Sequence, residues 1–309
     1  MKRLPSYLVA GLIGAVLAGG IVWIATRSVE DRPAATPPRT AQSAPATSSA
    51  GTSAETGSTE STPPPQRIDI ANLPNEAMLV DQVLVPVPSE IFAVLDKIGK
   101  PNWREVMRPL ENDRKLSSRE QIALLLGTVI ADGFIAVEAE DGAELQVIGN
   151  NVLKLSDALG VRQSVVKRSN AILEAADKKD WPRVRKELDG ALTDVRAAMI
   201  ELDSEALAQL VSLGGWLRGT EALASVVIRD YTQDAAELLH QPALIDHFDR
   251  RITTMPEKMR SDSLVAAMHK GLEEIRPLMG TGAVIPEGAV QNIGGIAERL
   301  VEVIGVKKE

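Results

Sequence analysis

Two charged residues, Asp132 and Arg218, stand inside long apolar runs of the sequence. Asp132 lies in the run 124–135, and Arg218 lies in the run 210–223. A charge that is buried without a partner is costly, so each residue needs a group of opposite sign. We therefore expect two helices to meet there, with Asp132 and Arg218 forming a buried ion pair that sets their register.

The same groups also allow a second interpretation, a polar ligand-binding or enzymatic site in an aliphatic pocket. Thr128 and Glu221 stand close to the two charged residues along the chain and would complete it. The candidate ligand-binding residues are then Thr128, Asp132, Arg218 and Glu221. A deep pocket holding these groups would favour a ligand site, whereas a tightly packed core with a broad exposed apolar patch would favour a module that binds another protein.

Both apolar runs are rich in glycine. One glycine in a helix interior costs about 1 kcal/mol relative to alanine, so several together indicate a compensating gain. The simplest gain is a close approach of two backbones. The segments Thr128-x3-Asp132-Gly133 and Gly214-x3-Arg218-Gly219 also align at an offset of 86 residues. That match is too short to establish an internal repeat.

Metal-binding patterns are weak in this sequence. Glu237 and His240 form one Glu-x-x-His unit, but di-iron helical bundles use two such units and two further glutamates. His269 and Glu273 stand one helical turn apart, a spacing that surface hydrogen-bonded pairs share. We expect no metal and no cofactor.

Motifs of the common catalytic and nucleotide-binding classes are absent from the sequence. There is no phosphate-binding loop, nucleophile elbow, zinc-protease helix or calcium loop, and the segment 280–282 reads as a turn. The chain has no cysteine, which excludes disulfides and thiolate chemistry. Its net charge of −8 provides no basic field for nucleic acid. We expect a protein that is not an enzyme.

Residues 1–27 are expected to form a transmembrane anchor. Lys2 and Arg3 precede the uncharged segment 4–26, which is long enough to cross a bilayer core of about 30 Å. A cleaved signal peptide is the alternative, although its apolar region is normally shorter and ends in small residues. The two sides of the segment carry nearly equal numbers of Lys and Arg residues, so the positive-inside rule gives only a weak orientation. We expect a single-pass protein of the inner (cytoplasmic) membrane, with its soluble domain periplasmic or otherwise extracytoplasmic.

Small residues recur at a spacing of four within this segment, at Gly11, Ala15 and Gly19. That spacing lets two membrane helices approach closely. Self-association through the anchor is therefore possible, although glycine and alanine are frequent in membrane helices in general.

Residues 28–66 are expected to form a disordered linker. The segment is rich in Pro, Ser, Thr, Ala and Gly and cannot bury enough apolar surface to offset the entropy of ordering. It would hold the following domain away from the bilayer without fixing its orientation.

Residues 67–309 are expected to form an all-α domain, a bundle or array of roughly nine helices. Only 3% of residues are aromatic, so the core must be aliphatic. The one β-leaning stretch, 78–87, contains Pro86 and Pro88 and is predicted to be an extended lead-in. Apolar periodicity and capping residues predict helices over these segments: 89–98, 118–139, 145–159, 164–176, 180–202, 205–229, 232–239, 242–252, 261–279 and 286–304.

These expectations favour a membrane-tethered envelope protein whose helical domain binds another envelope protein or acts as a scaffold, without catalysis. The alternative is the small-ligand-binding or enzymatic domain around Asp132, Arg218 and Glu221. A purely structural spacer is a third interpretation.

Overall fold

The computed structural model describes residues 78–80, 83–85, 101–108, 118–280, 282 and 284–305. All of them belong to one compact unit of the chain. From 101 to 305 the described residues are all-helical, with nine α-helices of five residues or more and no strand. The helices are α2 (Arg119–Glu138), α3 (Gly142–Leu159), α4 (Arg162–Asp177), α5 (Trp181–Glu201), α6 (Glu205–Arg229), α7 (Gln233–Glu237), α8 (Pro242–Thr253), the four-residue α9 (Glu257–Arg260), α10 (Ser263–Ile275) and α11 (Glu287–Gly305), with 3-10 turns η2 (Trp103–Glu105) and η3 (Arg276–Met279).

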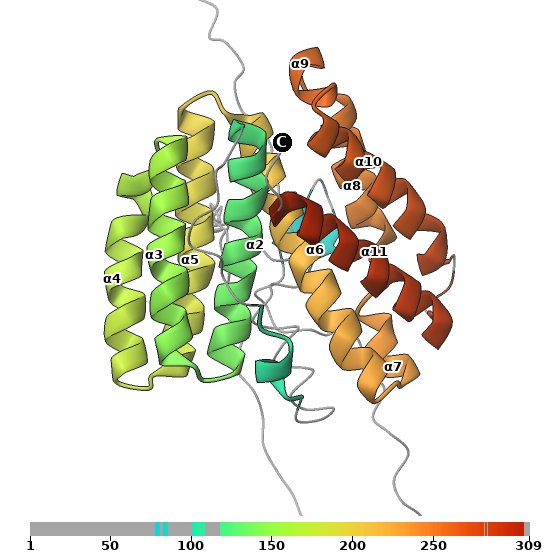
Figure 1. Cartoon of the computed structure of the whole chain (residues 1–309), viewed down its shortest axis with the longest axis horizontal. Helices are drawn as coiled ribbons and strands as arrows, with labels where there is room; N and C mark the ends of the chain where they lie inside the picture. Colours follow the sequence, from blue (N-terminus) through green and yellow to red (C-terminus); the bar gives the residue numbers. More distant parts are fainter. Residues whose placement is uncertain are drawn as a thin grey trace, which may run out of the picture. The chain divides into compact units, whose positions relative to one another are not determined.

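Helices α2 and α6 form the centre of the array. They pack against each other along their lengths, α3 and α5 contact α2, and α11 contacts α6. Figure 1 shows α3, α4 and α5 beside α2. Every residue from 123 to 137 is buried, as is every residue from 207 to 220. These two apolar runs lack a polar face because other helices surround them.

Local capping explains where several helices begin and end. The Ser118 hydroxyl accepts a hydrogen bond from the backbone N–H of Gln121, which closes the first turn of α2. Asp180 caps α5 in the same way by accepting from the N–H of Arg183. Gly160 ends α3 in the left-handed region at φ 82°, a conformation that glycine adopts without steric cost.

The predicted extended lead-in differs from the structure, which has a two-stranded antiparallel hairpin there. Strand β1 (Met78–Val80) pairs with β2 (Val83–Val85), with Met78 opposite Val85 and Val80 opposite Val83. Pro86 and Pro88 follow the second strand, so they do not interrupt the pairing.

The helix predicted over 261–279 is also divided in the structure. Helix α10 begins after Asp262, whose carboxylate accepts from the N–H of Leu264, and α9 precedes it as a separate turn. After Ile275 the chain tightens into η3, which contains Pro277. Proline lacks the N–H that an α-helix would use at that position, so regular α-helix ends before it.

Several predictions lie outside the described residues. These are the anchor with its membrane contact at 4–26, the small-residue stripe, the linker 28–66 and the helix 89–98. Within the described part of the chain, one helix is long and apolar enough to cross a membrane, and it is α2. Its burial among the other helices accounts for that composition.

Candidate functional site

The glycines of the two central helices lie where the backbones meet. A Cβ atom added to Gly127 would lie 1.9 Å from the carbonyl oxygen of Val211, and one added to Gly214 would lie 2.0 Å from that of Leu124. Neither distance leaves room for a methyl group. Gly133 differs, because an added Cβ would meet only side chains of α3 and α5 at 3.5 Å or more. The close approach of α2 and α6 therefore depends on Gly127 and Gly214.

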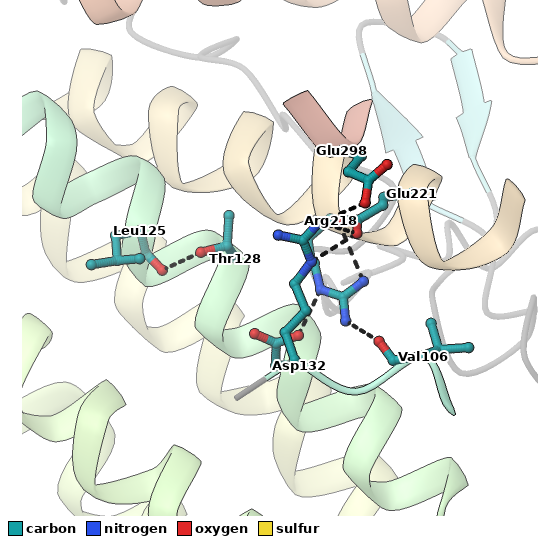
Figure 2. A network of polar contacts seen from close by, with 8 residues as sticks. Val106, Leu125, Thr128, Asp132, Arg218, Glu221 and Glu298 are labelled. Carbon is teal, nitrogen blue, oxygen red and sulfur yellow. Dashed lines mark hydrogen bonds and ion pairs between the residues drawn. The ribbon is translucent and has the colours of Figure 1, made fainter. Parts of the chain in front are cut away.

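The structure brings Asp132 and Arg218 together beside this crossing. The Arg218 Nε donates to Asp132 Oδ1 at 2.6 Å, and Nη2 donates to the backbone carbonyl of Val106 at 2.6 Å (Figure 2). Arg218 has no exposed surface and Asp132 retains 8%. Arg218 thus links α2, α6 and the short segment around η2.

Glu221 lies one turn beyond Arg218 and joins the network. Its Oε2 is 3.5 Å from Arg218 Nη1, while its Oε1 accepts from Arg108 Nε at 2.8 Å. Arg108 also forms an ion pair with Glu298 of α11, at 3.6 Å. Figure 2 shows these side chains as one continuous chain of polar contacts. The network therefore connects four segments that are distant in sequence.

Thr128 is not part of this network. Its hydroxyl donates to the carbonyl of Leu125 in its own helix at 2.8 Å, a common way for a buried threonine to satisfy its donor. Of the four candidate ligand-binding residues, the structure joins Asp132, Arg218 and Glu221 and leaves Thr128 apart (Figure 2).

Burial determines the electrostatics at Glu221. Removal of its carboxylate from water raises the pKa of Glu221, and the charge of Asp132 acts in the same direction. The positive charges of Arg218 and Arg108 oppose that shift without cancelling it. Glu221 Oε2 and Arg218 Nη1 also lack hydrogen-bond partners within the described part of the chain, although they face each other as an ion pair.

The histidines of the predicted metal patterns have other neighbours. His269 Nε2 lies 2.7 Å from Asp249 Oδ1, rather than pairing with Glu273. His240 Nε2 of the Glu-x-x-His unit is buried and has no hydrogen bond within the described residues. Among the described residues, no group of three or more His, Asp or Glu side chains could hold a metal ion.

Reasoning from the sequence missed three members of the network, namely the Val106 carbonyl, Arg108 and Glu298. Val106 and Arg108 stand in a short stretch with no helical periodicity, and Glu298 is an exposed residue of α11. No spacing in the sequence relates these positions to Arg218. Their proximity arises only when η2 packs against α2 and α11 packs against α6.

Comparison with known proteins adds no family. No protein-family model, no curated protein and no solved structure matches this chain.

Proposed function

We propose that this chain is a membrane-tethered helical module that binds another envelope protein or organises a complex, and that it catalyses no reaction. The observation that supports this most directly is the state of Arg218. Two of its three guanidinium nitrogens bond to protein acceptors, and the side chain has no exposed surface. A guanidinium group held in this way stabilises the packing of α2 on α6, and it has few free hydrogen-bond donors for a substrate.

The end of α5 is the surface that we favour for the partner. Ile200 and Leu202 are 47% and 53% exposed, and both lie near the turn into α6. Exposed large apolar side chains that cluster at one place are typical of contact sites. The tether inferred from the sequence would let this end of the domain reach a neighbouring protein.

Topology and partner can be tested together in intact cells. A C-terminal reporter that is active only outside the cytoplasm should be active. A photo-crosslinking amino acid at Leu202 should then capture one envelope protein repeatedly, whereas the same amino acid at the exposed Glu257 should not. An inactive reporter would invert the topology, and equal labelling from both positions would contradict a contact site at the end of α5.

The second candidate function is a ligand site at Glu221 and Arg218, and it is favoured by one observation. Glu221 Oε2 and Arg218 Nη1 lack hydrogen bonds within the described residues. A small polar ligand that bridged them would satisfy both. Saturable binding of a metabolite that is lost in Glu221→Gln would support this candidate over the scaffold.

A further inference from the structure

Residues 101–108, which we call the strap, contain η2 and are fastened to the ends of two helices by ion pairs. Arg104 Nη1 lies 2.5 Å from Oδ2 of Asp141, the residue that caps the start of α3. Glu105 Oε2 lies 2.5 Å from Nη1 of Arg229, the last residue of α6. The side chains of Arg104, Glu105 and Arg229 are 59%, 57% and 41% exposed. Solvent screens such pairs, so each adds little to the stability of the docked strap.

The inner attachments of the strap are few. Trp103 and Val106 are buried, and the Val106 carbonyl accepts from Arg218 Nη2 at 2.6 Å (Figure 2). Arg108 Nη2 lies 2.6 Å from Glu221 Oε1. The backbone N–H groups of Trp103 and Val106 donate to carbonyl groups of the strap itself. Separating the strap from the helices therefore breaks side-chain contacts and leaves its own turn intact.

The helices beneath the strap are held much more firmly. Every residue of 123–137 in α2 and of 207–220 in α6 is buried. The free energy of local opening follows the number of buried apolar contacts that opening breaks. A segment with two buried apolar side chains and several exposed ion pairs should therefore open well before a helix that is surrounded on all sides.

Release of the strap would change the charge balance at the centre of the domain. It would remove the acceptor of Arg218 Nη2, and it would withdraw Arg108, whose Nη2 is also 3.6 Å from Glu298 Oε1. Asp132 and Glu221 would then share the single positive charge of Arg218. The docked strap thus both covers this polar centre and supplies part of its positive charge.

We propose that the strap is a latch that undocks as a unit while the helices stay folded, and that its release uncovers Arg218 and Glu221. These two residues form the ligand site of the second candidate function. The latch would keep that site closed, and the inference rests on that candidate for what binds once the site is open. Undocking itself depends neither on a ligand nor on the scaffold role.

Site-specific thiol labelling of the full-length protein in mild detergent tests the latch. The chain has no cysteine, so one introduced thiol reports on one position. Val106→Cys places it in the strap, and Val129→Cys makes the same replacement in the buried centre of α2. Maleimide labelling is followed at several urea concentrations below the unfolding midpoint. We expect Val106→Cys to react about 100-fold faster, with a rate that depends little on urea because undocking exposes little surface.

Two further changes test whether ion pairs hold the latch. Arg108→Gln should raise the labelling rate of Val106→Cys, relative to that of Val129→Cys, about 10-fold, since it removes charged hydrogen bonds of the strap. Arg276→Gln removes an exposed arginine that pairs with Asp246, far along the chain from the strap, and should leave this ratio unchanged. Raising sodium chloride from about 0.05 M to about 0.5 M should also increase the ratio, because salt screens exposed pairs.

Hydrogen exchange of the wild type gives a readout that needs no variant. The N–H groups of Glu105 and Val106 donate within the strap, and they should exchange while the amides of α2 remain protected. The proposal would be overturned if both thiols reacted at the same rate with the same urea dependence, because the strap would then open only on global unfolding. Equal effects of Arg108→Gln and Arg276→Gln would overturn it as well.

Failure of the latch can be told apart from failure of the proposed functions. Crosslinking from Leu202 tests the scaffold role, and metabolite binding tests the ligand site. Neither measurement reads the labelling rate of the strap.

Discussion

A methyl group on Gly214 would lie 2.0 Å from the carbonyl oxygen of Leu124 on the neighbouring helix. The obstructing atom belongs to the backbone and cannot rotate away. On the other helix, a Cβ atom added to Gly127 would lie 1.9 Å from the carbonyl oxygen of Val211. Two glycines, one on each helix, therefore set the separation of α2 and α6, and with it the position of Arg218 relative to Asp132.

Gly214→Ala should destabilise the domain strongly. Overpacking a tight core costs about 1–3 kcal/mol, and here the two helices must separate, so we expect a loss of about 3 kcal/mol in the free energy of unfolding. Urea unfolding followed by circular dichroism measures it. Gly295→Ala is the matched control. Nothing lies within 4 Å of a Cβ added there, inside α11, so we expect a gain of about 1 kcal/mol from helix propensity. A neutral Gly214→Ala would contradict the close crossing.

Asp132→Asn should leave the buried guanidinium of Arg218 without its hydrogen-bonded carboxylate, with only the more distant Glu221 at 3.5 Å beside it. Removing one partner of a buried pair costs about 3–5 kcal/mol, whereas replacing both by apolar residues is often nearly neutral. We therefore expect the double variant Asp132→Leu, Arg218→Met to recover most of the loss. Chemical denaturation of the two variants and the wild type gives both numbers. If the double variant lost as much stability as Asp132→Asn, the cost of the single variant would not come from leaving Arg218 without its partner.

An exposed ion pair provides the reference for that experiment. Lys178 and Glu174 are 2.6 Å apart at i,i+4 on α4, and both side chains are more than half exposed. Solvent screens such a pair, so Lys178→Gln should cause no measurable change in stability. A loss comparable with that of Asp132→Asn would mean that charge alone, rather than burial, determines the effect.

Glu221 should lower the free energy of unfolding as the pH rises, which is the opposite of what a carboxylate with a lowered pKa does. Its pKa in the folded protein lies above 4.5 because the carboxylate is buried. The folded state then holds more protons than the unfolded state from pH 4.5 upward until the folded-state pKa is passed. Stability from this group therefore decreases as the pH rises through that window. The free energy of unfolding of the wild type minus that of Glu221→Gln should decrease with rising pH; a flat difference would contradict the shift.

Asp141 should contribute in the opposite direction. Its carboxylate accepts from the N–H of Glu144 at the start of α3, and this hydrogen bond first, with that to Arg104, lowers the pKa of Asp141 below 3.8. Its stabilising effect is complete above pH 3.8 and is lost as the pH falls below that value. Asp141→Ala should cost about 1 kcal/mol at pH 7. Asp141→Asn keeps the capping hydrogen bond but does not titrate. The stability of this variant should therefore lack the loss at low pH that Asp141 causes in the wild type, as measured by urea unfolding at several pH values.

Local signals in the sequence account for most of the helices. The helix predicted over 205–229 has the same bounds as α6, and the helix predicted over 118–139 differs from α2 by one residue at each end. Each depends on residues within one helical turn of the boundary. The predictions diverged where a contact beyond the local chain intervened, as in the pairing of β1 with β2, or where Pro277 changed the type of helix.

The charged centre was predictable only in part. Asp132 and Arg218 stand out because a charge inside an apolar run demands a partner, and each was the obvious partner of the other. Arg196, which is also buried, gave no such signal, because arginines on an amphipathic helix such as α5 usually face water. Its burial follows from tertiary packing, in which α5 contacts α2, α4 and α6.

The sequence by itself determined the class of the domain and the positions of its helices, since apolar periodicity, caps and glycine stops act over a few residues. Tertiary structure alone decided which polar groups meet. Arg218 reaches the Val106 carbonyl across 112 residues, and Arg108 reaches Glu221 across 113. Such contacts depend on the crossing of helices set by Gly127 and Gly214, because a side chain spans only a few ångströms and must be brought within that reach by the packing of the backbones.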